Sequence, residues 1–343
     1  MTIKGSELEN LFECAYLLLL VDQHDEGLWG KSITTEDKAL YASFAEAHAR
    51  KRAESITVTF FAVDAISTLT KNAQNSAIKR ALDCLPDHRS DGGYGSFMEL
   101  ISAYPEPKYQ ILVSCRHTAT ALLTYLLFQE SIDEKIVQSV RFLVDHFNKD
   151  GGWGVSADPE KYDSDCLSTA YITKVLTQVE KMGIKDFLSE NYQSKLDSAI
   201  TKGLNWLGAE NKKNNGFWVF RDESMKLPIS AAILAAFYEL KNYKNEIYEE
   251  TLDRIASLQN EGDGGWPLSP KGRSELRPTI WVINALINSD EEKYIDRIEK
   301  GIDFITSNFS RQPYTRNLNA ADWAMLLKLA HYKNINISPE SDD

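Results

Sequence analysis

A glycine–aromatic motif that recurs along the chain constrains its fold more than any other feature. Clear copies read DGGYG at 91–95, DGGWG at 150–154 and DGGW at 263–266. Looser copies read EGLWG at 26–30 and NGFW at 215–218. Five copies in 343 residues form an internal repeat, which predicts that one structural unit is stacked several times.

The motif is typical of a turn that ends a helix. Glycine adopts positive φ at low cost, so the glycines and the acidic or amide residue before them can close a helix in a tight turn. The aromatic residue that follows is a large apolar group that can fill the gap between neighbouring helices. Each copy therefore predicts a helix, a turn and another helix.

The segments between the motifs have helical spacing of apolar residues and fall into two alternating classes. One class is apolar on nearly all sides, which predicts burial, and the other has a polar face, which predicts exposure. The apolar segments are 56–69, 115–129, 165–180, 227–240, 278–288 and 320–329. The amphipathic segments are 5–21, 74–85, 133–147, 191–210, 245–260 and 292–308. No segment shows the sustained two-residue alternation that predicts a strand.

Six helices of each class can close into an all-α ring, an α/α toroid (α6/α6 barrel), with the apolar class inside. An open superhelix of helix pairs is the alternative, but it would leave one face of every apolar helix in water. We expect a single toroid domain over residues 1–335, because the motif runs through nearly the whole chain. The acidic tail, residues 336–343, is expected to be disordered.

Composition and charge narrow the range of partners. The net charge of −12 argues against nucleic acid and against an anionic membrane surface. No apolar run reaches the roughly 18 residues of a membrane span, and the N-terminus lacks the pattern of a secretory signal. The cysteines are scattered without a C-x-x-C pair, which is typical of reduced thiols. We therefore expect a cytoplasmic protein without a transmembrane segment.

The alternation of helix, Gly-Gly-Trp turn and apolar helix resembles the repeat of squalene–hopene cyclases, class II terpene cyclases and the β subunits of protein prenyltransferases. Residues 259–266 are similar to the glutamine–tryptophan repeat of that superfamily, and 23–29 are a looser copy. The resemblance covers about residues 5–330. It implies the toroid fold, and as ligand an isoprenoid or other hydrophobic small molecule. It does not single out one activity, because the superfamily hosts several chemistries.

In a toroid, the N-termini of the inner helices gather at one end of a central funnel. Helix N-termini attract anions such as a diphosphate, because their N–H groups are unpaired and the helix dipole is positive there. We expect Arg116, Arg277 and Arg316, near these ends, to contact such a ligand. The alternative is that each arginine caps a helix or forms an ion pair at the rim.

Aromatic residues on the inner helices predict an apolar sleeve for an isoprenoid chain. Phe61, Tyr171 and Trp281 are the candidates for contact with the ligand, and aromatic faces can stabilise a carbocation. Ordinary core packing is the alternative for each of them.

Residues 163–166, Asp-Ser-Asp-Cys, resemble the Asp-x-Asp-Asp motif of class II cyclases at the start of an inner helix. In that family the middle aspartate protonates an alkene or epoxide and so starts a carbocation cascade. The resemblance implies Asp165 as the acid and Asp163 as its neighbour, with His117 on the preceding inner helix holding one carboxylate. Cys166 departs from the family's last aspartate. The alternative is that Asp163 or Asp165 is an N-cap.

A zinc site is the second site that the resemblance to this superfamily raises. Protein prenyltransferase β subunits bind zinc through an aspartate, a cysteine two residues later and a histidine further along. Here Cys166 lies three residues after Asp163, and His117 lies upstream of both. The order and the spacing support neither zinc nor magnesium, so we expect no metal cofactor.

Three functions remain open from the sequence. The leading hypothesis is a terpene cyclase-like protein that binds an isoprenoid-type hydrophobic substrate in the funnel and starts cyclisation through Asp165. The second is a prenyltransferase β-like subunit with zinc and a helical protein partner. The third is a non-catalytic toroid that binds a lipid or a protein.

Overall fold

The structure is a computed structural model that describes part of the chain. The described residues are 11–12, 14–17, 30–31, 53–54, 56–70, 75–84, 92–99, 109–129, 131–154, 163–219, 225–238, 246–269, 272–309, 318 and 320–333. Arg316 and the predicted tail at 336–343 lie outside them, as does most of the first predicted helix.

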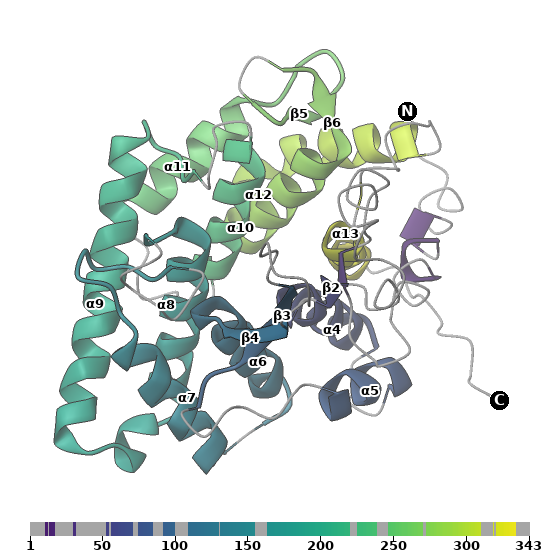
Figure 1. The fold of residues 1–343 in the computed structure, drawn as a ribbon. Helices are drawn as coiled ribbons and strands as arrows, with labels where there is room; N and C mark the ends of the chain where they lie inside the picture. The colour runs from purple at the N-terminus through teal and green to yellow at the C-terminus, as the bar shows by residue number, and fades with distance from the viewer. Residues whose placement is uncertain are drawn as a thin grey trace, which may run out of the picture.

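The apolar helices form a closed inner ring. Its members are α4 (Ile56–Thr70), α6 (Cys115–Leu126), α8 (Cys166–Lys181), α10 (Lys226–Tyr238), the first half of α12 (Leu276–Phe309) and α13 (Ala320–Tyr332). Each packs against the next in this order, and α13 packs back against α4, so the ring closes (Figure 1). The open superhelix is therefore excluded.

The amphipathic helices lie outside this ring. They are α5 (Ser76–Cys84), α7 (Glu134–Asp145), α9 (Glu190–Lys213) and α11 (Glu246–Ser257), and Figure 1 shows them at the periphery. The second half of α12 continues the series, because the non-helical backbone at Asp290 separates the two helices that the sequence predicts there.

Burial separates the two classes as the sequence predicts. Every residue of α8 from 168 to 177 is buried. By contrast, α9 buries one stripe along its length, made of Leu196, Ala199, Ile200, Gly203, Leu207 and Asn211. The prediction of an all-α toroid with the apolar helices inside is confirmed.

Short hairpins, which the sequence does not predict, lie between the turns and the inner helices. They pair β1 (Gly30–Lys31) with β2 (Ala53–Glu54), β3 (Gly95–Glu99) with β4 (Tyr109–Val113), and β5 (Trp266–Pro267) with β6 (Ser274–Glu275), all antiparallel. The strands are too short, from two to five residues, to show a two-residue alternation.

The tryptophan of the copy at 150–154 joins two helices. The backbone N–H of Trp153 donates to Thr169 Oγ1 in α8 at 3.0 Å, and its indole Nε1 donates to the Leu143 carbonyl in α7 at 2.8 Å. The motif therefore links the outer helix before it to the inner helix after it.

The same pair of hydrogen bonds recurs in two further repeats. Trp218 donates to Ser230 Oγ and to the Leu207 carbonyl, both at 2.9 Å. Trp266 donates to Thr279 Oγ1 at 2.8 Å and to the Ile255 carbonyl at 2.9 Å. In the clear copy with tyrosine, Tyr94 N–H donates to Thr118 Oγ1 at 2.9 Å. We call this arrangement the turn latch.

Glycine is required in these turns for two reasons. Gly264 has φ of +80°, a conformation that side chains rarely adopt, and an added Cβ would lie 2.5 Å from the Lys300 carbonyl oxygen. Gly92 is similar, with φ of +88° and 2.3 Å to the Gln138 carbonyl. The turn thus brings the chain against the backbone of the next outer helix.

Candidate functional site

The turn latch fixes which side of each inner helix faces the centre of the ring. Thr118, Thr169 and Thr279, which accept the latch hydrogen bonds, are each the fourth residue of their helices, and buried Thr59 is the fourth residue of α4. The latch residues face the outer helices. A residue two positions later is rotated by about 200° and therefore faces the centre.

Three aromatic residues occupy that central position. Phe61, Tyr171 and Trp281 are each the sixth residue of α4, α8 and α12. The Phe61 ring centroid lies 5.9 Å from that of Tyr171 and 5.3 Å from that of Trp281, both edge to face. We call these residues the aromatic trio, and the sequence predicts all of them as ligand contacts.

The aromatic trio meets across the middle of the ring. Helix α6 lies between α4 and α8, and α13 lies between α4 and α12, so these contacts join helices that are not neighbours. Tyr171 is 4% and Trp281 8% exposed, whereas Phe61 is partly exposed. Phe61 is therefore the member of the aromatic trio that keeps accessible surface.

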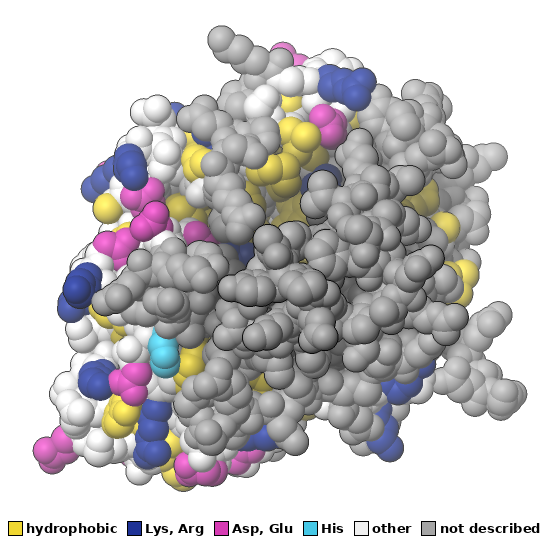
Figure 2. Space-filling model, in the orientation of Figure 1, with side chains coloured by type: hydrophobic (Ala, Val, Ile, Leu, Met, Phe, Trp, Pro, Cys, Tyr) yellow, Lys and Arg dark blue, Asp and Glu magenta, His cyan; other side chains and the backbone are white. Residues whose placement is uncertain are grey.

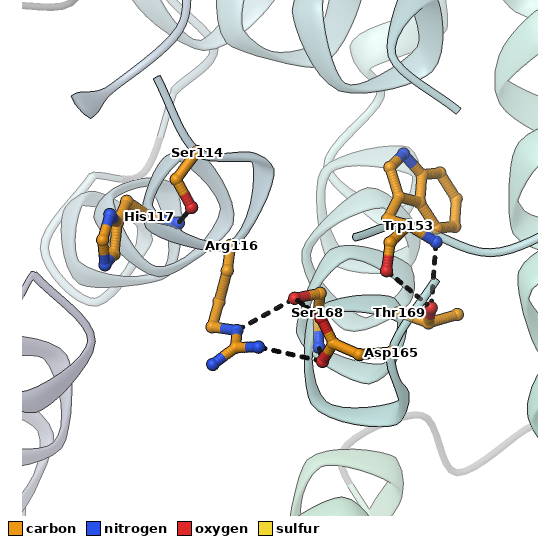
Figure 3. A network of polar contacts seen from close by, with 7 residues as sticks. All are labelled: Ser114, Arg116, His117, Trp153, Asp165, Ser168 and Thr169. Carbon is orange, nitrogen blue, oxygen red and sulfur yellow. Dashed lines mark hydrogen bonds and ion pairs between the residues drawn. The ribbon is translucent and has the colours of Figure 1, made fainter. Parts of the chain in front are cut away.

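A polar network joins the starts of α6 and α8 (Figure 3). Arg116 Nη2 contacts Asp165 Oδ1 at 2.9 Å, and Arg116 Nε donates to Ser168 Oγ at 2.9 Å. Ser168 donates to Asp165 twice, from its N–H at 2.8 Å and from its hydroxyl at 2.6 Å. Asp165 is therefore the N-cap of α8 and the ion-pair partner of Arg116.

His117 lies on the other side of α6 from Arg116 (Figure 3). Its Nδ1 is buried and has no hydrogen-bond partner within the described chain. Burial, and after it the charge of Arg116, lowers the pKa of His117 to about 4, so the imidazole is neutral at neutral pH. The carboxylate of Asp165 is held by Arg116.

A second arginine–carboxylate pair joins α12 and α13. Arg277 Nη2 contacts Asp322 Oδ2 at 2.8 Å, and the indole Nε1 of Trp281 donates to Asp322 Oδ1 at 2.8 Å. Asp322 is 2% exposed. It therefore orients one member of the aromatic trio as well as the arginine.

The structure does not bring together all the predicted site residues. Asp163 is exposed and lies outside the network around Asp165. Within the described residues, no three His, Cys, Asp or Glu side chains are placed to hold a metal, so Asp163, Cys166 and His117 do not form a site. Arg316 lies outside the described residues.

Two residues of the site are missing from the sequence-based set. Ser168 follows the N-cap Asp165 by three positions, which is the spacing at which a helix side chain can reach back to its cap. That spacing could have identified Ser168 from the sequence. The contact between Asp322 and Trp281 spans 41 positions, and no local pattern indicates it.

The buried cysteines at the starts of α6 and α8 are expected to be unreactive. Burial is the main cause that raises the pKa of Cys115 and of Cys166 to about 12, whereas Cys14 is exposed. Since the thiolate is the attacking form, iodoacetamide at mildly alkaline pH should label Cys14 in the native protein and spare the other two. Peptide mapping by mass spectrometry measures this, with urea-unfolded protein as control. Rapid native labelling of Cys166 would contradict it.

Comparison with solved structures places this fold among terpene cyclases. A protein from Actinoplanes has a TM-score of 0.60 and 13% identity, over 93% of this chain and 98% of that one. The type II terpene cyclase MstE from Scytonema has a TM-score of 0.60 and 15% identity, over 95% and 99%. The ent-copalyl diphosphate synthase from Streptomyces platensis has a TM-score of 0.55 and 13% identity, over 82% of this chain and 50% of that one.

These likenesses establish the fold but not the activity. The chain has the toroid fold of the type II terpene cyclases, as its resemblance to them implies. No protein-family model and no characterised protein sequence matches the chain. No helix in the described residues is both long and apolar enough to cross a membrane.

Proposed function

We propose that the chain is a terpene cyclase-like protein that binds an isoprenoid-type hydrophobic molecule in the centre of its inner ring. The observation that carries the proposal is the aromatic trio, whose contacts bring apolar rings of non-neighbouring inner helices together while Phe61 stays partly exposed. Burying an apolar chain against such a surface is favourable by about 25 cal/mol per Å².

The charged residues indicate how the proposed ligand is oriented in the ring. Arg116 and Arg277 are each the second residue of an inner helix, one turn closer to its N-terminus than the level of the aromatic trio. A ligand with an anionic or polar end near these arginines would place its apolar chain toward Phe61. In Figure 2, hydrophobic side chains also gather below β5 and β6, with a basic side chain among them.

The solved neighbours support this class of ligand. Scytonema MstE is described in complex with geranylgeranyl dihydroxybenzoate as substrate and with merosterolic acid A as product. The first of these molecules combines an isoprenoid chain with an aromatic carboxylic acid. It is the first compound to test on this chain.

Asp165 is the candidate acid of a cyclisation reaction. An acid that protonates an alkene must carry a proton before the reaction. In the structure, both carboxyl oxygens of Asp165 accept hydrogen bonds from Ser168, and Oδ1 also pairs with Arg116. Catalysis through Asp165 therefore requires the bound substrate to displace one of these contacts.

The test is incubation of the purified chain with geranylgeranyl dihydroxybenzoate, squalene, and farnesyl and geranylgeranyl diphosphates. Mass spectrometry detects cyclised product, and quenching of tryptophan fluorescence detects binding. If Asp165 is the acid, Asp165→Asn should lower product formation by about 10²–10⁴-fold, while Asp163→Asn should leave it unchanged. Normal product from Asp165→Asn would remove Asp165 from the reaction, and absence of binding by every compound would reject the proposal.

The contacts of Asp165 favour a second candidate function, which is binding without catalysis. In this function Asp165 and Arg116 hold α6 and α8 together, and the toroid retains a hydrophobic ligand or a protein partner unchanged. Tight binding without product formation, in wild type and in Asp165→Asn alike, would select this function over cyclisation.

A further inference from the structure

We propose that the site accepts ligands whose polar end is neutral or singly charged and rejects those that end in a diphosphate. This inference rests on the proposed function, because it concerns the polar end of the same hydrophobic ligand. It is drawn from the charged side chains at the starts of the inner helices, taken as the residue before each helix and its first three residues.

Both arginines that the structure describes at these starts are paired with a carboxylate of the following inner helix. Arg116 of α6 contacts Asp165 at the start of α8 at 2.9 Å (Figure 3). Arg277 of α12 donates to Asp322 Oδ2 of α13 from Nε at 2.9 Å and from Nη2 at 2.8 Å. The same arrangement thus occurs twice, each time with the arginine as the second residue of its helix.

The two ion pairs lie on different sides of the ring. Helix α10 packs between α8 and α12, and α4 packs between α13 and α6. The Arg116 and Asp165 side chains are each 15% exposed, and that of Arg277 is 28% exposed. A polar end group that reaches either arginine therefore also meets a carboxylate.

The starts of the inner helices carry no net charge in the described part of the chain. The cations and the anions there balance, being Arg116, Lys226 and Arg277 against Asp165, Glu275 and Asp322. His117 adds no positive charge at neutral pH, because burial, and after it the charge of Arg116, lowers its pKa to about 4. The whole protein is acidic, with a net charge of −12. Neither the helix starts nor the rest of the protein therefore supplies the excess of positive charge that a polyanion requires.

The charge of the end group decides whether this arrangement attracts it. A diphosphate carries about three negative charges at neutral pH, because the last pKa of a terminal phosphate is near 6. Beside Asp165 or Asp322 such a group meets like charge, which disfavours binding. The helix N-termini supply only partial positive charge, roughly half an elementary charge each. A hydroxyl or a single carboxylate is satisfied by a few N–H donors, so these end groups are accepted.

The experiment compares end groups of different charge on the same chain. Farnesyl and geranylgeranyl chains are each tested as the alcohol, the carboxylic acid and the diphosphate, and a saturated series consists of hexadecanol, palmitic acid and hexadecyl phosphate. Quenching of tryptophan fluorescence measures each dissociation constant. The wild type should bind the alcohols and the acids at least about tenfold more tightly than the diphosphates.

Two variants test the role of the carboxylates. Asp165→Asn and Asp322→Asn each remove one negative charge and keep the size of the side chain. Each should improve diphosphate affinity by about tenfold and change alcohol affinity by less than about threefold. The double variant should combine both gains, because the two pairs share no residue. Asp165→Asn decides the matter if Asp322→Asn does not fold, since asparagine caps a helix as well as aspartate does.

A matched control separates the local charge from the charge of the whole protein. Asp163→Asn also removes one negative charge, from an exposed side chain outside both ion pairs. It should change diphosphate affinity by less than about twofold, because water screens an exposed charge. An equal gain in Asp163→Asn and Asp165→Asn would overturn the role given to the paired carboxylates.

The remaining outcomes distinguish this inference from the proposed function. If diphosphates bind the wild type as tightly as the alcohols do, or if neither asparagine variant improves them, the inference fails and the function stands. If the saturated series shows the preference while no isoprenoid binds, the selection by charge stands and the isoprenoid function fails. If no compound binds to the wild type, both are overturned.

Discussion

Replacing Asp322 with alanine is expected to lower the free energy of unfolding by about 3 kcal/mol. The carboxylate is nearly fully buried and accepts from both the Arg277 guanidinium and the Trp281 indole. Its removal takes away the acceptor of the Arg277 guanidinium and of the Trp281 indole N–H. Removing one partner of a buried ion pair lowers stability because the remaining charge is left uncompensated. The expected loss of unfolding free energy is no larger than this, because the Arg277 side chain is 28% exposed and keeps part of its hydration.

Urea denaturation of Asp322→Ala beside Asp163→Ala measures this effect. Asp163 is an exposed acid, so its replacement should change stability by less than about 0.5 kcal/mol. Asp322→Ala should also weaken ligand binding at the aromatic trio, because Trp281 loses the group that orients it. Equal stability of the two variants would show that the pair between α12 and α13 does not hold the ring.

Replacing Trp266 with alanine is expected to cost about 4–5 kcal/mol of unfolding free energy. The side chain is 0% exposed and fills the space between α11 and α12, and it donates the turn-latch hydrogen bond to the Ile255 carbonyl. Large-to-small substitutions of this kind lose the burial of the ring and leave a cavity.

Two further variants separate the parts of that loss. Trp266→Phe keeps an aromatic ring and loses the indole donor, so it should cost about 1–2 kcal/mol. Trp206→Ala removes a partly exposed tryptophan of α9 that lies outside the turn latch, and it should also cost about 1–2 kcal/mol. Thermal and urea unfolding measure all three. A loss in Trp266→Ala no larger than that in Trp206→Ala would contradict the structural role of the repeat.

The sequence predicts the ring because the pattern that builds it is periodic. Each glycine–aromatic turn is predicted from a few consecutive residues. The apolar character of segments such as 227–240 predicts burial directly. The capping role of Asp165 is likewise local, and it is one of the two alternatives that the sequence offers for that residue. The sequence does not predict the hairpins because their pairing, such as Phe97 with Ile111, joins segments that are not adjacent in the sequence.

The arrangement of the site could not be predicted, because it depends on side chains far apart in the sequence. The sequence marks Phe61, Tyr171 and Trp281 as candidates, but their mutual contact spans more than two hundred positions between the first and the last. The pairing of Arg116 with Asp165 crosses from one repeat to the next. Hydrophobic periodicity predicts which face of a helix is buried, but it does not predict which side chains that face contacts.

A crystal structure of the chain with geranylgeranyl dihydroxybenzoate tests the central claim most directly. Electron density for the isoprenoid chain is expected inside the inner ring, in contact with Phe61. The carboxylate end is predicted to lie toward Arg116 and Arg277. A ligand bound on the outer helices, or a ring centre filled by side chains beside an unbound ligand, would contradict it.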